Sequence, residues 1–237
     1  VPGSGSYSRD ITTASPKAQQ FFDQGLRLAW GFYFPESIAS YQQAAIYDPT
    51  HPMPYWGMAH AMGPNPNSRY ARMPDDPKGE GLKAINMARE RLAQATPLQR
   101  KLINALFVLY DKKTIADDAA RDRAYLSAMR KLNQQYPNDP DIAALYAASY
   151  MNIGRWDYWD SQGNPKSETL RVAKALQHII DQNLNHPGTL HLHIHLLEAS
   201  MEPEQALVSA NALEATAPIA GHIVHMPAHI YMLVGRY

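Results

Sequence analysis

The chain is organised around two histidine-rich stretches, His186-Pro-Gly-Thr-Leu-His191-Leu-His193-Ile-His195-Leu-Leu-Glu198 and Gly221-His222-Ile-Val-His225-Met-Pro-Ala-His229. Together they hold seven of the ten histidines in the 237 residues. His225 lies 34 residues after His191, and His229 lies 34 residues after His195. A period of about 34 residues is the length of one helix–turn–helix repeat unit, so the spacing predicts consecutive repeats of this kind.

Each stretch places two of its histidines four residues apart, and Glu198 follows His191 by seven residues. Side chains at these spacings share one face of an α-helix. The sequence therefore predicts that two neighbouring helices present two histidine pairs and a carboxylate to the same groove.

The composition narrows the classes of partner and ligand. The 22 basic and 22 acidic residues cancel, which gives no reason to expect nucleic acid or an anionic membrane as a partner. No run of about 18 apolar residues occurs, so we expect no membrane span. The absence of cysteine excludes thiolate metal sites, iron–sulfur clusters and disulfides, and any metal must bind His, Asp, Glu or Met. It is also compatible with an oxidising compartment, and we expect an extracytoplasmic rather than a cytoplasmic location.

Apolar residues at helical spacing begin after a Gly/Ser-rich start, so we expect a flexible segment over 1–14 and a helical repeat domain over 15–237. Proline and capping residues mark the helix starts. Helices are expected from Pro16, Phe34, Pro52, Pro140, Pro187, Pro203 and about 222–224, and over 79–95, 97–110, 116–136 and 168–183. The segments 63–77 and 157–165 are expected to be insertions, and the first is too rich in Pro and Asn for helix.

The first expected helix pair carries a recognisable signature. Gly25, Tyr41, Ala44 and Pro49 stand at small, aromatic, small and helix-ending positions, and on these residues the sequence resembles the tetratricopeptide repeat (TPR) family. Small residues let paired helices approach, the aromatic ring fills the gap, and proline ends the unit. The resemblance covers nearly all of the chain as architecture, and it implies an all-α solenoid of TPR-like antiparallel helix pairs.

The last residues, Gly235-Arg236-Tyr237, resemble a turn that introduces the second helix of a TPR-like unit. We therefore expect that the natural array continues beyond Tyr237 and that the repeat domain is truncated at its C-terminal end.

In the TPR family the first helix of each unit lines a concave groove. Aligning the units on their first helices places His191 with His225 and His195 with His229, and Glu198 falls one turn further along the same stripe. The resemblance thus predicts that all five side chains line the groove and that each histidine pair converges.

This set predicts a metal site. We expect His191, His195, His225 and His229 to bind one transition-metal ion, with Glu198 as a fifth ligand or as an acceptor that fixes the tautomer of a ring. Nitrogen and oxygen donors without thiolate suit zinc, copper, iron or nickel, and they do not select among these metals.

Three further residues of the stretches have other expected roles. Pro227 would break the interior of a helix, but it is tolerated in the first turn if the helix begins near 222–224. His222 then lies near the cap and outside the ligand set. His193 is expected on the opposite face, and His186 at a turn or cap.

Two functions remain open. The first is a metal-binding TPR-like protein; if a coordination position stays open, hydrolytic or oxidative chemistry is possible, with Glu198 as the candidate base. The second is a non-catalytic scaffold whose groove binds a protein, a peptide or another copy of the chain. No nucleophile elbow, phosphate loop or dinucleotide fingerprint identifies an enzyme. The aromatic residues Trp156, Tyr158 and Trp159 are expected to cover the end of a helix pair in preference to forming a ligand platform or lid.

Overall fold

The computed structural model describes residues 3–64, 73–183 and 185–236. Within these ranges the chain forms eleven α-helices and no β-strand, which confirms the expected all-α class. It divides into two compact units, each of which is described here by itself. One unit contains residues 8–128. The other contains residues 3–7 together with residues from 129 onward, and the boundary falls inside α6 (Asp118–Gln135).

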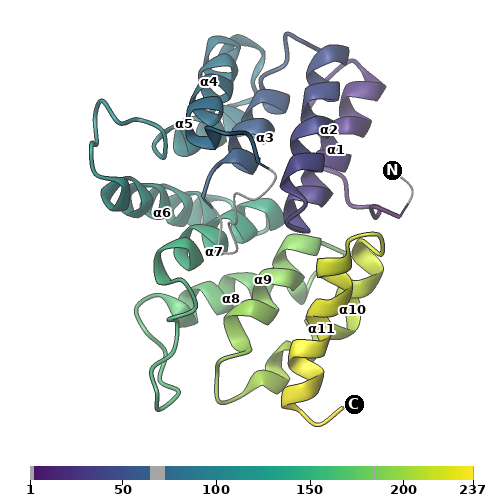
Figure 1. The fold of residues 1–237 in the computed structure, drawn as a ribbon, viewed down its shortest axis with the longest axis vertical. Helices are drawn as coiled ribbons and strands as arrows, with labels where there is room; N and C mark the ends of the chain where they lie inside the picture. The colour runs from purple at the N-terminus through teal and green to yellow at the C-terminus, as the bar shows by residue number, and fades with distance from the viewer. Residues whose placement is uncertain (1–2, 65–72, 184, 237) are drawn as a thin grey trace. The chain divides into compact units, whose positions relative to one another are not determined.

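The 8–128 unit is built from helices that follow one another closely. They are α1 (Pro16–Trp30), α2 (Phe34–Tyr47), α3 (Pro52–Met62), α4 (Pro77–Glu90), the 3-10 helix η1 (Leu92–Gln94), α5 (Pro97–Phe107) and the first part of α6. Helices adjacent in the chain pack against each other from α1 to α5, as the purple and blue ribbons of Figure 1 show. The unit therefore buries its apolar surface between consecutive helices.

Tyr41 of α2 fills the space between three of these helices. A Cβ atom added to Gly25 of α1 would lie 2.8 Å from the Tyr41 ring, and one added to Gly57 of α3 would lie 2.5 Å from it. Such distances are shorter than van der Waals contact, so neither position accepts a side chain while the ring stays in place. The close approach of small residues around an aromatic ring agrees with the packing expected from the sequence.

The second unit is arranged around one helix. Its elements are α7 (Pro140–Gly154), α8 (Thr169–Ile180), α9 (Pro187–Leu197), η2 (Pro203–Ala206), α10 (Leu207–Leu213), η3 (Glu214–Thr216) and α11 (Gly221–Leu233). Helix α9 packs against α7, α8, α10 and α11 (Figure 1), and every one of its residues is buried. A helix that is covered on all sides needs no polar face, which explains why α9 is apolar apart from Thr189 and its histidines.

Six helices begin in the same way, with proline as the first helical residue and a side chain before it that accepts a hydrogen bond from a first-turn amide. The pairs are Ser15-Pro16, His51-Pro52, Asp76-Pro77, Thr96-Pro97, Asp139-Pro140 and His186-Pro187. Proline is suited to this position because the amide it lacks would have no intrahelical partner. These starts lie at or close to the positions expected from the sequence.

The segment before α1 contains no helix in its described part, and it has specific contacts. Tyr7 and Ile11 are buried. The Tyr7 hydroxyl donates a hydrogen bond of 2.6 Å to Oδ2 of Asp141 in α7, and the carbonyl of Gly3 accepts one from the amide of Ile219. Residues 3–7 are therefore bonded to the unit that contains α7 to α11.

The two expected insertions differ in what can be described. Residues 65–72 of the first lie outside the described residues, and its end at Pro77 already belongs to α4. The second, 157–165, is free of helix and contains an isolated bridge between Trp159 and Pro165. None of the helices seen in the described ranges has both the length and the apolar character needed to cross a membrane.

Candidate metal centre

Helix α9 carries three histidines that are almost completely inaccessible to solvent. His191, His193 and His195 expose 0%, 1% and 3% of their surface. His191 and His195 share one face, with ring centroids 4.8 Å apart. His193 points elsewhere, and its Nδ1 lies 2.9 Å from the hydroxyl of Ser209 in α10. This confirms the expectation that His193 lies on the opposite face.

Helix α11 brings a third imidazole to the pair on α9. Nε2 of His222 lies 2.9 Å from Nε2 of His191. His191, His195 and His222 each offer a ring nitrogen, and these atoms lie within 4.8 Å of one another. Among the residues whose placement is described, these three histidines form a group that could hold a metal ion.

His222 lies outside the ligand set expected from the sequence, because a helix that begins near 222–224 would place this residue near the cap. Helix α11 begins at Gly221, with Ala220 as its N-cap, so His222 is its second residue. It then shares a face with His225 and His229, three and seven residues further on. That spacing was visible in the sequence and could have identified His222.

The expected reason for the tolerance of Pro227 is wrong. Because α11 begins at Gly221, Pro227 lies inside the helix and not in its first turn. Proline has no amide to donate to the carbonyl of Ile223, so the helix lacks one backbone hydrogen bond there. The missing bond would join residues 223 and 227, which lie on either side of His225 in the sequence.

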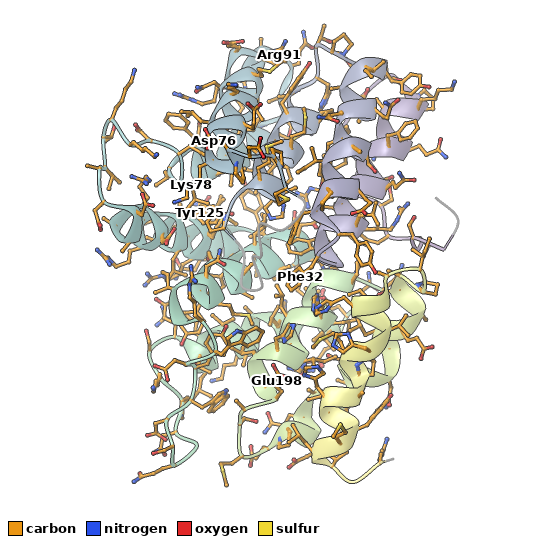
Figure 2. All side chains as sticks on the ribbon, in the orientation of Figure 1. Phe32, Asp76, Lys78, Arg91, Tyr125 and Glu198 are labelled. Carbon is orange, nitrogen blue, oxygen red and sulfur yellow. The ribbon has the colours of Figure 1, made fainter. Side chains whose placement is uncertain are left out.

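Glu198 is the residue directly after α9, and its carboxylate holds two rings. Oε1 lies 3.0 Å from Nδ1 of His195, and Oε2 lies 2.5 Å from Nδ1 of His229. Figure 2 shows Glu198 at the end of α9, on the side of α11. A carboxylate accepts hydrogen bonds, so both Nδ1 atoms donate, and Nε2 is the nitrogen that each ring has left for a metal. Glu198 was expected to be either a fifth metal ligand or an acceptor that fixes the tautomer of a ring, and these contacts favour the acceptor role.

His225 and His229 lie beside the group of three. Their Nε2 atoms are 3.3 Å apart, and the ring of His225 lies 4.9 Å from that of His222. His225 is exposed and His229 is half-buried, whereas the histidines of α9 are buried. The structure thus links all four expected histidines and Glu198, while the compact group consists of His191, His195 and His222.

The electrostatic environment favours the protonation states that a metal requires. Burial lowers the pKa of His195, and burial together with the neighbouring histidines lowers that of His222 to about 4. Burial alone would raise the pKa of Glu198, but the hydrogen bonds and charges of His195 and His229 outweigh it, and the pKa lies below its usual value. Neutral imidazoles therefore stand beside an ionised carboxylate at neutral pH, and metal ligands must be in this state.

Trp156 covers one side of the group. Its ring meets that of His195 edge-on at 4.7 Å, and 43% of the residue is exposed. Arg155 and Trp156 have φ angles of 40° and 71°, a left-handed conformation that costs about 1–2 kcal/mol in residues with a Cβ atom. Two such residues in succession reverse the chain after α7. Tyr158, by contrast, is buried against Gly154 at the end of α7. This position agrees with the expectation that the aromatic residues of this segment cover the end of a helix.

His186 stabilises the start of α9 and does not join the group. Its Nδ1 accepts a hydrogen bond of 2.9 Å from the amide of Thr189, so its proton is on Nε2, which lies 3.1 Å from Oδ1 of Asp141. The expectation of a cap is confirmed.

No protein-family model matches the chain, and no curated protein matches it either. The class of protein is therefore defined by the structure alone: an all-α protein with a histidine cluster that could hold a metal ion.

Proposed function

We propose that this chain is a TPR-like helical repeat protein that binds a transition-metal ion through His191, His195 and His222. The observation that carries the proposal is the convergence of three imidazole nitrogens within 4.8 Å of one another from two packed helices. Three protein ligands leave one position of a tetrahedral ion open to water or to another ligand.

The separation of the first two donors suits coordination. Two nitrogens bound to one tetrahedral ion at roughly 2.0–2.1 Å lie roughly 3.3 Å apart. Nε2 of His191 and Nε2 of His222 are 2.9 Å apart. In the metal-free protein this distance fits an N–H···N hydrogen bond, so the ion would replace a shared proton without a large movement of either ring.

The donors restrict the metal without naming it. Neutral imidazole nitrogens suit zinc, copper or iron, and the chain has no cysteine to supply a softer ligand. Glu198 is proposed to orient His195 through its Nδ1 proton, an arrangement common for metal-binding histidines. Because both carboxylate oxygens are already engaged by imidazoles, this role suits Glu198 better than that of a catalytic base.

The solenoid of TPR-like pairs, with its concave groove, is part of the same proposal. It is supported by the packing of consecutive helices within each unit and by the close contact of Gly25 and Gly57 with Tyr41. In repeats of this kind, small residues let paired helices approach and an aromatic ring fills the gap.

Elemental analysis of the full chain, purified without a His-tag and without chelator, tests the metal. We expect at least one equivalent of zinc, copper or iron per chain, and its loss in His195→Ala. His178→Ala is the matched control, because His178 is exposed on α8 and hydrogen-bonds Asn138 instead of the cluster. Circular dichroism establishes that both variants keep their helices. A protein that holds no metal and takes up none on addition would contradict the proposal and leave the non-catalytic scaffold, with a peptide or a second copy in the groove.

A further inference from the structure

We propose that His225 and His229 hold a second divalent transition-metal ion, so that the cluster is a two-ion centre joined through Glu198. This inference rests on the proposed function and deepens it, because the first ion is the one assigned to His191, His195 and His222.

The distance between the donors supports a second ion. Two nitrogens on a tetrahedral ion with bonds of roughly 2.0–2.1 Å lie roughly 3.3 Å apart. Nε2 of His225 and Nε2 of His229 are 3.3 Å apart. The four-residue spacing on one helix is also the spacing of the two histidines in helical zinc motifs. The pair is thus arranged for coordination without a change of rotamer.

The histidines fall into two sets. Successive ring centroids from His195 through His191, His222 and His225 to His229 lie 4.8 to 5.2 Å apart, and the rings of His195 and His229 lie 6.1 Å apart. His225 and His229 also lie outside the group of three whose nitrogens converge. They therefore form a separate pair of donors.

Glu198 supplies the second argument. One of its oxygens accepts the Nδ1 proton of His195, which belongs to the first set, and the other accepts that of His229, which belongs to the second. Each hydrogen bond fixes a proton on Nδ1 and so leaves Nε2 of its ring for a metal. A centre with one ion needs only the bond to His195. Orientation of His229 by the same carboxylate is accounted for by a second ion.

The surroundings of the second pair predict a weaker site. The side chain of His229 is 37% exposed, and His225 is exposed as well, so water would complete the coordination. The neighbouring groups are the ring of His222, whose centroid lies 4.9 Å from that of His225, and the carboxylate of Glu198. The charge of Glu198 offsets part of the repulsion between two dications. With two protein ligands instead of three, we expect the second ion to bind at least about tenfold more weakly.

Titration of the metal-free, untagged chain with zinc, in competition with a chromophoric chelator, counts both ions. We expect two equivalents in the unchanged protein. In His225→Ala we expect one, with the affinity of the tighter ion changed by less than about threefold. His178→Ala, the exposed control on α8, should keep both. Because His225 is exposed, its replacement should preserve the fold, and thermal unfolding of the metal-free variant checks this; His225→Gln, which keeps a polar side chain of similar length, serves as a second variant.

The outcomes separate the two proposals. A single equivalent in the unchanged protein would overturn the second ion and leave the first assignment intact. Two equivalents that persist in both His225 variants would place the second ion elsewhere and overturn the assignment to His225 and His229. Absence of any binding would overturn the proposed function itself.

Discussion

Helices α3 and α9 share their length, their N-terminal cap and their burial, but they carry different side chains at equivalent positions. Each has eleven residues, begins with a histidine cap followed by proline, and is buried along almost its whole length. At the position that holds His191 in α9, α3 has Trp56, and where α9 has His195, α3 has His60. The two helices are therefore buried to a similar extent although different side chains occupy these positions.

The neighbours of these side chains make the difference. His60 stacks on Trp56 of its own helix, with ring centroids 5.4 Å apart. His191 and His195 instead meet His222 of another helix and the carboxylate of Glu198. A histidine on a buried helix thus becomes a candidate ligand where a neighbouring helix supplies a second donor at the same depth. The spacing of a histidine within its own helix does not by itself make it a candidate ligand.

Removal of one donor from α9 should have the largest effect. We expect His191→Ala to lower zinc affinity by more than about a hundredfold, because loss of a group that merely orients a ligand already costs about ten- to a hundredfold. Competition with a chelator measures the change. His60→Ala in α3 should leave the affinity unchanged, and equal effects of the two substitutions would break the distinction between the helices.

Substitution of the orienting carboxylate should cost less. In Glu198→Gln, the amide nitrogen can only donate, so one of the two rings must give up its Nδ1–H donor and turn its proton to Nε2, the nitrogen meant for the metal. We expect affinity to fall by about ten- to a hundredfold, measured by the same competition. Glu202→Gln, an exposed carboxylate in the loop after α9, is the control. An unchanged affinity in Glu198→Gln would remove Glu198 from the site.

A smaller effect, on stability alone, is expected on the α3 side of the comparison. Gly57→Ala would bring a methyl group to 2.5 Å from the Tyr41 ring, and overpacking of this kind costs about 1–3 kcal/mol. Urea unfolding measures the loss. Zinc affinity should not change, since the substitution touches no imidazole; a loss of metal without a loss of stability would contradict this division.

The smallest effect is expected from Tyr158, whose phenol packs at the end of α7, two residues after Trp156, which covers His195. Burial raises the pKa of Tyr158 to about 12 from its usual 10.0. A raised pKa means that its contribution to stability is complete below pH 10 and is lost as the pH rises toward 12. Between pH 10 and 11 this residue should account for a loss of about 1 kcal/mol. Unfolding of Tyr158→Phe over this range should show a shallower dependence on pH, and an identical slope would contradict the burial argument.

The sequence was sufficient for most of the helix starts, because proline with a capping residue before it depends only on local chemistry. It was also sufficient for the face that carries His191 and His195, which follows from the helical period. It contained the spacing that joins His222 to His225 and His229, but it did not fix the start of α11, and a shift of one or two residues there moves this ring from the cap to the shared face. It could not choose between the two roles of Glu198 either, since that choice depends on which ring nitrogens its oxygens meet.

The position of Trp156 could not be predicted from the sequence for a different reason. Its contact with His195 depends on two successive residues with positive φ, a conformation that neither arginine nor tryptophan favours. Only the packing of the surrounding helices can select such a backbone. The backbone preferences of these residues therefore did not predict that the ring of Trp156 covers His195.

The contact between Tyr7 and Asp141 has a consequence for how the molecule forms. These residues are 134 positions apart in the chain, and Asp141 also contacts His186, the cap of α9. On a ribosome, residues 3–7 emerge before α7 and α9 and must wait until these helices have been synthesised before they find their partners. Contacts of such long range slow folding because a large loop must close first. We therefore expect the unit that holds the histidine cluster to be the later of the two to complete its folding during synthesis.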